Sequence, residues 1–278
     1  MDKIYIVVPV HNRARTTESF INSILSQTYQ NFHLLVIDDG STDNTKITIE
    51  RTIPANKLTI IRGNGDLWWG GSLQKGYDWI KRKVGHTEDI VLFINDDTKF
   101  QSNFLENAVK FLKGKSKTLL LSKCYDESNN SWDNIGIHIN WFLIHFRKAR
   151  KKNEIDCLST RGLFLRICDL LTIGGFKPNR LPHYLSDYEF TIRAKKMGYD
   201  LIVDRGLVLS TQPSEIIEVN NLSTYIHFAF SKKNNTNPIY LSNFIIISCP
   251  KGLKTINILY IWIKFIFKLI LFITLRRQ

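Results

Sequence analysis

The chain has 278 residues, 44% of them hydrophobic, which is enough apolar material for one large core. Its net charge of +13 calls for an anionic partner, either nucleic acid or a membrane surface. No helix-turn-helix, zinc-finger or RNA-binding sheet motif is present, so we expect no nucleic-acid partner. The four cysteines include no C-x-x-C pair, which favours reduced thiols in a cytosol over disulfides or a zinc site.

The apolar pattern predicts an α/β fold, with strands and helices alternating along the first half of the chain. The first strand begins almost at the first residue without a basic leader, so we expect no signal peptide. After Cys124 the pattern becomes irregular, with loops or short strands over 132–146, a candidate strand at 162–167 and a helix at 186–198. The regular part is predicted to contain strands at 4–10, 32–37, 58–62, 90–94 and 118–122, and helices at 15–27, 43–51, 70–84 and 102–113.

The second predicted strand ends in an acidic turn that contains glycine, Asp38 to Asp43. In such a turn one carboxylate can cap the following helix. Another can accept hydrogen bonds from a pyrimidine edge or from ribose hydroxyls. Asp-Gly-Ser is also common turn chemistry, so the turn alone leaves both interpretations open.

A glycine-rich loop with two adjacent tryptophans, residues 62–76, follows the third predicted strand. Glycine lets the backbone approach a diphosphate or a sugar closely. The indole rings of Trp68 and Trp69 offer flat apolar faces on which a sugar or a base can stack. The alternative is that the two rings simply cover the end of the sheet.

Asn95, Asp96 and Asp97 directly follow the fourth predicted strand. Parallel α/β sheets place ligands at the carboxyl ends of their strands. Two adjacent carboxylates there need a positive neighbour, and oxygen ligands favour Mg²⁺ or Mn²⁺. The alternative is a helix cap, in which Asp97 or Thr98 caps the helix predicted near Ser102.

A third acidic segment, Ser186 to Glu189, opens the helix predicted at 186–198. The helix dipole stabilises a carboxylate at a helix start, whereas burial beside Tyr188 would raise the pKa of that carboxyl group. Asp187 is therefore a candidate general base, and a simple N-cap is the alternative.

Taken together, these segments resemble the inverting, metal-dependent glycosyltransferases of family two, which have the GT-A fold. The resemblance covers residues 3–209, in matching order and spacing. The loop at 62–76 looks like one found in bacterial rhamnosyltransferase-like members. The segments that carry the resemblance are Val7 to Arg13, Gln27 to Phe32, Val36 to Asp43, Asn95 to Asp97 and Ser186 to Glu189.

The resemblance implies a nucleotide-sugar site at the carboxyl ends of the first strands. Asp38 and Asp39 would hold a uracil or thymine base and its ribose, and Asp96 would face the donor ribose or sugar. The donor-side residues are Pro9, Arg13, Asp38, Asp39, Gly65, Asp66, Trp69, Gly71 and Asp96.

The resemblance also implies that Asp97 holds Mg²⁺ or Mn²⁺. Asp97 matches the second acid of the family's Asp-any-Asp motif, whose first acid is Asn95 here, so we expect a less tightly held cation. Many members complete the metal site with a His after a late strand, where this chain has Leu209 to Gln212. We therefore expect ligation by one acid together with the donor diphosphate and water.

On the acceptor side, Asp187 would remove the proton from the attacking hydroxyl while the cation neutralises the departing diphosphate. The family's usual Glu-Asp pair is Ser186-Asp187 here, and Glu189 is the second candidate for the base. His183 is either an extra ligand or acceptor contact, or a hydrogen-bonded structural residue. The acceptor-side residues are His183, Tyr184 and Ser186.

The carboxyl-terminal segment 256–275 is almost entirely apolar and aromatic. As a helix it would be about 30 Å long, enough to cross a bilayer. Lys264 and Lys268 in its middle make a span costly. We therefore expect an amphipathic helix in the membrane plane, with its lysines toward anionic headgroups and its aromatic face in lipid. The alternatives are a helix packed on the domain or on a second copy, and a true span.

We thus predict a GT-A catalytic domain, α/β with a mostly parallel sheet, at residues 1–215. Its nucleotide-sugar-binding half is 1–123 and its acceptor-side half is 124–215. Residues 216–278 are predicted to form a helical, membrane-associating extension, with shorter helices within 222–230 and 240–247.

The expected activity is transfer of a sugar from a UDP- or dTDP-sugar to a lipid-linked glycan. Rhamnose is the sugar suggested by the loop at 62–76. The product would be a bacterial surface polysaccharide such as lipopolysaccharide, made by a peripheral protein at the inner, cytoplasmic face of the plasma membrane. The alternatives are a catalytically silent sugar-nucleotide-binding or scaffold protein of the same fold, and a basic membrane- or nucleic-acid-binding module.

Overall fold

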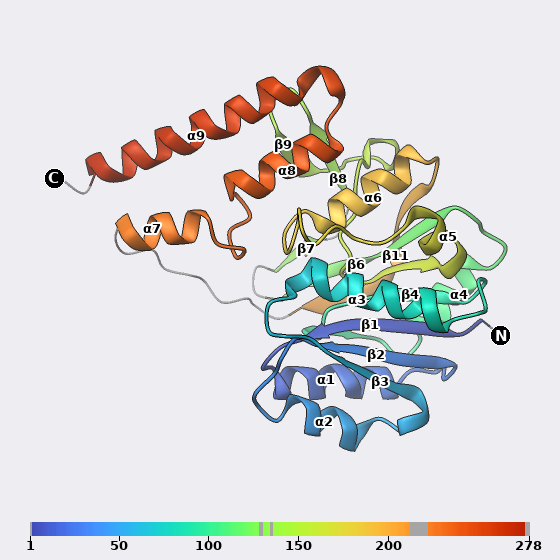
Figure 1. The fold of residues 1–278 in the computed structure, drawn as a ribbon. Coiled ribbons are helices and arrows are strands. Elements are labelled where there is room, and N and C mark those ends of the chain that lie inside the picture. The colour runs from blue at the N-terminus through green and yellow to red at the C-terminus, as the bar shows by residue number, and fades with distance from the viewer. Residues whose placement is uncertain (1, 128–129, 134–135, 212–221, 276–278) are drawn as a thin grey trace.

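The computed structural model describes residues 2–127, 130–133, 136–211 and 222–275. Its helices pack against a central β-sheet (Figure 1). The strand order in that sheet is β3-β2-β1-β4-β10-β6-β11-β5, with β7 paired to β6. The strands are β1 (Ile4–Val10), β2 (Phe32–Asp38), β3 (Leu58–Arg62), β4 (Ile90–Phe93), β5 (Thr98–Phe100), β6 (Thr118–Asp126), β7 (Ser131–Asp133), β10 (Leu163–Arg166) and β11 (Asp200–Thr211). A separate hairpin consists of β8 (Ile137–Asn140) and β9 (His145–Lys148).

The strand directions determine which loops meet. The pairs β1–β2, β2–β3 and β1–β4 are parallel, as the sequence predicts. Strand β10 runs antiparallel to both neighbours, β4 and β6. The amino end of β10 therefore lies beside the carboxyl end of β4, where the N–H of Gly162 donates to the carbonyl of Phe93 at 2.9 Å.

Helices cover both faces of the sheet because its central strands are apolar on both sides. The helices are α1 (Ala14–Leu25), α2 (Thr45–Thr52), α3 (Trp68–Lys83), α4 (Phe104–Leu112), α5 (Ile167–Ile173), α6 (Ser186–Lys196), α7 (Leu222–Ala229), α8 (Pro238–Ser248) and α9 (Lys254–Leu275). Short 3₁₀ turns occur at Ala55–Lys57, Lys152–Glu154 and Lys251–Leu253.

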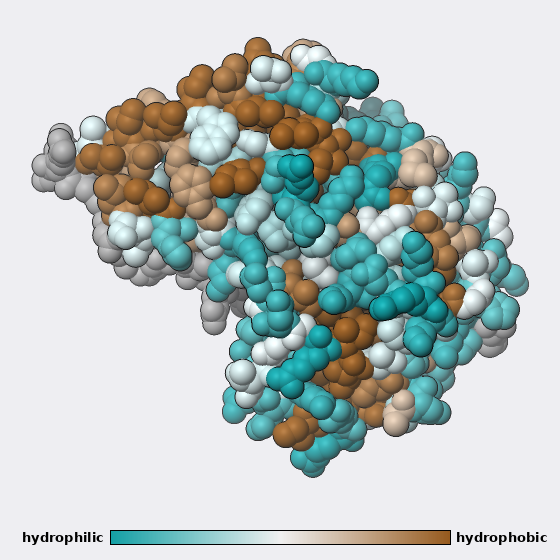
Figure 2. Space-filling view, viewed as in Figure 1, coloured by the Kyte–Doolittle hydropathy of each residue, from teal (hydrophilic) through white to brown (hydrophobic). Residues whose placement is uncertain are grey.

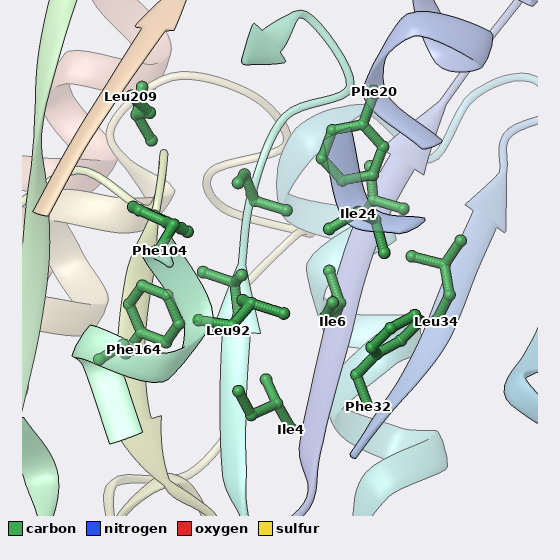
Figure 3. Close-up of a cluster of buried hydrophobic side chains, with 14 of the residues drawn as sticks. Ile4, Ile6, Phe20, Ile24, Phe32, Leu34, Leu92, Phe104, Phe164 and Leu209 are labelled. Atoms are coloured by element: carbon green, nitrogen blue, oxygen red, sulfur yellow. The ribbon is translucent and has the colours of Figure 1, made fainter. Parts of the chain in front are cut away.

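Two hydrophobic cores result from the alternation of side chains along the strands. Ile4 and Ile6 of β1 pack with α1, α2 and α4 in one core, and Figure 3 shows this cluster around Phe20, Phe104 and Phe164. Val7 faces the other core, which α3, α5 and α6 cover.

The predicted strands and helices of the first half are confirmed, with helix ends shifted by a few residues. Strand β5, helix α5 and strand β11 were not predicted. Strand β5 has three residues, too few to show alternation, and β11 carries charged residues such as Asp204 and Arg205 that interrupt an apolar pattern. The four cysteines are unpaired, as expected.

The carboxyl-terminal extension is helical, as predicted, and its helices α8 and α9 pack on the domain. Phe244, Ile245 and Ile261 share a buried cluster with Leu181 and Ile192. The amide of Asn257 in α9 donates to the carbonyl of Trp141 at 2.7 Å. The predicted boundary at 215/216 lies outside the described residues.

Helix α9 leaves much of its apolar surface uncovered. In the part of the chain that the structure describes, one helix, 251–274, is long and apolar enough to cross a membrane. Figure 2 shows hydrophobic residues gathered over α9 and α7. The large exposed side chains of α9 recur at helical spacing and are Ile256, Leu259, Tyr260, Ile263, Ile266, Phe267, Ile270 and Leu271.

Candidate active site

The acidic turn after β2 is held by hydrogen bonds to backbone groups. The buried Asp38 carboxylate accepts from the N–H of Ser41 at 2.9 Å. The Asp39 carboxylate accepts from the N–H groups of Gly65 at 2.9 Å and Trp68 at 3.0 Å. Asp39 thus ties the end of β2 to the loop after β3. Neither aspartate is the N-cap of α2, so the capping interpretation does not apply to them.

The turn after β1 closes over the same region. Asn12, at a φ of +50°, donates its N–H to the hydroxyl of Ser41 at 3.0 Å and accepts from the N–H of Thr42 at 2.8 Å. The His11 ring nitrogen Nδ1 lies 2.6 Å from the carbonyl oxygen of Asp39. Pro9, beside Ile37 in β1–β2, lies just before this turn.

The glycine-rich loop needs glycine for steric reasons. A Cβ at Gly63 would lie 2.6 Å from Asp39 Oδ1, and one at Gly70 would lie 2.5 Å from the carbonyl oxygen of Leu181. Gly65 is exposed at a φ of +88°. Gly71, predicted to contact the donor, is instead buried against Leu67, because α3 begins three residues earlier at Trp68.

The two tryptophans have different surroundings. The indole N–H of Trp69 donates to the hydroxyl of Thr160 at 2.9 Å, and its ring both covers the core beneath α3 and lines a cavity. The indole N–H of Trp68 donates to Asp66 at 2.7 Å, and its ring meets His183 edge-on at 5.4 Å. Trp68 has a φ of +56°, a strained conformation of the kind that clusters at functional sites.

Asp96 is a buried acid that the fold pairs internally. Its Oδ1 accepts from Arg13 at 2.8 Å and its Oδ2 from the hydroxyl of Thr17 at 2.9 Å. Burial raises the pKa of Asp96 to about 6, although Arg13 acts in the opposite direction. This differs from the prediction that Asp96 faces the donor, since a carboxylate buried this deeply needs a cation beside it.

Asp97 and Asn95 keep oxygen atoms without partners. Asp97 Oδ2 lies 3.6 Å from Arg13, but Asp97 Oδ1 and Asn95 Oδ1 are buried and accept no hydrogen bond. The capping alternative is not supported, because α4 begins at Phe104 and the Thr98 hydroxyl donates to the carbonyl of Asn95. Orphaned, hard oxygen donors are what Mg²⁺ or Mn²⁺ would require.

A metal site here would depend on further ligands. The described residues contain no group of three or more His, Cys, Asp and Glu side chains that could hold a metal ion. The expectation of one protein acid completed by diphosphate and water stays a prediction. In the segment Leu209 to Gln212, where the resemblance led us to look for a His, the first three residues end β11 and position 212 lies outside the described residues.

Asp187 is partly buried in the first turn of α6 and has no N-cap role. The residue at the cap is Leu185, with a strained φ of +68°. Burial raises the pKa of Asp187 to about 6, opposed by backbone N–H groups such as that of Tyr188, which donates to Oδ1 at 2.9 Å. Within the described ranges no salt bridge reaches this carboxylate, and Arg161 acts on it only from a greater distance.

Glu189, the second candidate for the base, is paired from two sides. Its oxygens accept from Lys177 at 2.7 Å and from Arg193 at 2.9 and 3.0 Å, and its side chain is 2% exposed. Burial alone would raise the pKa of Glu189, but these two cations lower it below its ordinary value. Glu189 therefore stabilises α6 and is not available as a base.

The predicted acceptor-side residues surround Asp187. Ser186 is buried and donates its hydroxyl to the carbonyl of His183 at 3.1 Å. Burial, together with the charge of Lys233, lowers the pKa of His183 to about 4, so His183 is neutral at pH 7 and its buried Nδ1 has no partner. Tyr184 is 42% exposed beside it.

Two cavities meet at Asp187. The first, of about 390 Å³, brings together the predicted residues Trp69, His183 and Tyr184 with Asn95. The second, of about 670 Å³, is mainly apolar and extends to α7 and α9. Tyr184, Asp187 and Tyr188 line both. Asp96 and Asp97 border a separate hollow of about 240 Å³, next to Arg15.

The sequence analysis missed several residues of this site. Thr160 and Arg161 line the first cavity with Lys148 of β9. Thr160 and Arg161 precede β10, which runs antiparallel to β4, so its amino end lies at the site. The glycine at position 162, which has a φ of +83° in the structure, was the sequence signal that could have indicated a turn here. Asp66 was predicted to contact the donor. In the structure its Oδ1 lies 2.6 Å from Nζ of Lys232, a residue between α7 and α8.

The chain matches the Glycosyl transferase family 2 model over residues 5–172, more than half of its length. It is 44% identical over 156 residues to the UDP-Glc:alpha-D-GlcNAc-diphosphoundecaprenol beta-1,3-glucosyltransferase WfgD of Escherichia coli, covering 56% of this chain and 58% of that one. It is 25% identical over 203 residues to the glycosyltransferase AglE of Haloferax volcanii, covering 71% and 63%.

Each match to the other curated relatives covers less than half of the relative's length. The chain spans 15% of an uncharacterized glycosyltransferase of Rickettsia bellii and 42% of the glycosyltransferase GlyG of Streptococcus pneumoniae.

Solved structures confirm the GT-A fold. TarS (1–349) of S. aureus in complex with UDP-GlcNAc superposes with a TM-score of 0.62 at 17% identity, covering 90% of this chain and 82% of that one. The mannosyltransferase PcManGT of Pyrobaculum calidifontis, in complex with GDP-Man and Mn²⁺, gives 0.58 at 17% identity, covering 88% and 63%.

The different partners of Asp187 and Glu189 predict opposite effects on stability. The folded-state pKa of Asp187 lies above its ordinary value of 3.8, so the ionised carboxylate destabilises the fold as pH rises through about 6. Asp187→Asn should leave the melting temperature at pH 7.5 unchanged or raised. Glu189→Gln should lose roughly 3 kcal/mol, because Lys177 and Arg193 would lose their partner.

Thermal unfolding of both variants at pH 7.5 and pH 4 measures this difference. At pH 4 the gain from Asp187→Asn should shrink, because the wild-type carboxyl group is then largely protonated. A clear loss of stability in Asp187→Asn at pH 7.5 would contradict the assignment of Asp187 as the unpaired acid.

Proposed function

Because the chain belongs to glycosyl transferase family 2, we propose that it transfers a sugar, with inversion, from a nucleotide-diphosphate donor to a hydroxyl group of a lipid-linked glycan. The observation that carries this proposal is the position of Asp187. It is an acid without an ion pair among the described residues, with a pKa of about 6, where the two cavities meet. A general base works best with a pKa near the working pH.

The donor would lie over the loops that follow β1, β2 and β4. Asp38, Asp39 and Arg13 surround this edge of the sheet, and the Gly65 loop is the segment whose backbone can approach a diphosphate. Since Asp39 already binds two backbone N–H groups, its role is to shape the loop that receives the nucleotide.

The acid Asp97, together with Asn95, has the unpartnered oxygen atoms that fit Mg²⁺ or Mn²⁺. When bound, such a cation supplies positive charge to the leaving diphosphate. PcManGT and GalNAc-T7 were solved with Mn²⁺, which supports a divalent cation for this chain.

Asp187 would accept the proton of the acceptor hydroxyl as the hydroxyl oxygen attacks the sugar carbon from the face opposite the departing diphosphate. At pH 7 the carboxyl group is mostly ionised and so able to accept a proton. Trp69 and His183 would confine the sugar, because both line the first cavity and His183 is neutral there.

The choice of substrates rests on the relative with 44% identity. Its name gives UDP-Glc as donor and GlcNAc-diphosphoundecaprenol as acceptor. We therefore place a UDP-hexose first and dTDP-rhamnose second as donors. A prenyl-diphosphate glycan as acceptor agrees with the exposed apolar surface of α9 and with a place at the inner face of the bacterial plasma membrane, in polysaccharide synthesis.

Donor binding should depend on Asp97. In a thermal-shift panel of UDP- and dTDP-sugars with and without Mn²⁺, one donor should raise the melting temperature of the wild type, mainly with metal. Asp97→Ala should lose the metal-dependent part. Asp200→Ala, which removes an exposed carboxylate, is the matched control and should keep it. Equal shifts in both variants would exclude Asp97 as the metal ligand.

Transfer should depend on Asp187 and on pH. Asp187→Asn should keep donor binding and lose about 10²–10⁴-fold in kcat, the usual contribution of a general base. For the wild type, kcat should rise with pH and level off above about 6, since only the ionised carboxylate accepts the proton. Near-normal turnover of Asp187→Asn, or a flat profile between pH 5 and pH 7, would show that another group is the base.

A further inference from the structure

The second cavity connects the candidate base with the carboxyl-terminal helices. Its volume is about 670 Å³, and it shares Tyr184, Asp187 and Tyr188 with the first cavity. From Asp187 it extends between the β8–β9 hairpin and α7 to the side of α9. A molecule bound along it would therefore have one end at the base and the other at α9.

The walls of this cavity are apolar and aromatic. Ile144 and Phe146 line it from the hairpin, and Phe228 and Phe265 line it from α7 and α9. Helix α7 is fixed to α9 by ring contacts, with Tyr225 stacked on Phe272 at 4.5 Å and Phe230 against Phe265 at 5.4 Å. The cavity is thus built by packed helices and suits an apolar chain.

Two lysines face this apolar space. Lys264 and Lys268, one turn apart in α9, line the cavity together with Asp187. They lie on the same side of α9 as Asn257 and Ile261, which are buried against the domain. Both lysines are also exposed, so the prediction that they point to lipid headgroups stays a prediction. In the described part of the chain, neither lysine forms a salt bridge.

We propose that this cavity binds the prenyl-diphosphate portion of the acceptor, with Lys264 and Lys268 as the diphosphate site. This inference rests on the proposed function and specifies how its acceptor is recognised. Two cations about 6 Å apart on one helix face complement the two phosphates of a diphosphate. The aromatic walls then receive the first isoprenoid units, and the sugar extends to Asp187.

The same arrangement explains the division of α9 into two faces. The lysine face recognises the acceptor at the second cavity, and the apolar face lies in the lipid from which the acceptor comes. A neutral lipid would gain no charge-assisted contact from these two exposed lysines.

The test compares two double variants with the same loss of charge. Lys264→Gln/Lys268→Gln removes the proposed diphosphate site. Lys251→Gln/Lys254→Gln removes two lysines at the start of the same helical segment, outside the cavity lining. Farnesyl diphosphate is the probe, and farnesol shows the contribution of the apolar chain alone. Binding is measured by calorimetry, with UDP and Mn²⁺ as the ligand for the donor side.

The first variant should bind farnesyl diphosphate roughly 10- to 100-fold more weakly, the loss typical of charge-assisted hydrogen bonds. The control variant should bind it like the wild type, and both should keep their affinity for UDP and for farnesol. Absence of farnesyl diphosphate binding in the wild type, or equal losses in both variants, would overturn the proposal.

Vesicles of phosphatidylglycerol give the other decisive comparison. If the first variant loses binding to these vesicles but keeps binding to farnesyl diphosphate, the lysines contact headgroups and the proposal is wrong. If the proposed glycosyltransferase function is wrong, donor binding and sugar transfer will be absent. Binding of farnesyl diphosphate that depends on the two lysines can still be measured in that case, so the two failures are distinguishable.

Discussion

Burial of a carboxylate is costly unless a cation or hydrogen-bond donors surround it, and this constraint organises the molecule. Glu189 is held between Lys177 and Arg193, and Asp96 between Arg13 and Thr17. These acids hold elements together. Asp187 has no such cation beside it among the described residues, and Asp97 keeps one orphaned oxygen. In our account the incompletely paired acids are the ones available as a general base or as a metal ligand.

The sequence predicts the fold best where strands are buried on both faces. The segments at 4–10, 32–37 and 90–94 are almost entirely apolar, so their strands and the polar turns after them could be located. Thr160 and Arg161 could not be, because they precede a strand. Only the antiparallel pairing of β10 brings that amino end to the site, and local patterns carry no information about pairing direction.

The same limit applies to the choice between candidate residues. Asp187 and Glu189 lie two positions apart in one helix and look alike in sequence. What separates them is Lys177, which comes from a loop, and Arg193, one turn later in α6. For α9, the spacing showed that Lys264 and Lys268 share a side, but the buried contacts of Asn257 and Ile261 show that this side faces the domain. In our proposal the tail is therefore part of the acceptor side.

A crystal structure of the chain with Mg²⁺ and UDP tests the central claim most directly, namely that the incompletely paired acids form the catalytic site. We expect a cation about 2.0–2.1 Å from Asp97 Oδ1 and bonded to the diphosphate. The nucleotide should lie over the turn at Asp38 and Asp39. The carboxylate of Asp187 should face the part of the first cavity that the nucleotide leaves empty. A nucleotide bound elsewhere, or one bound with Asp97 still unligated, would contradict the account.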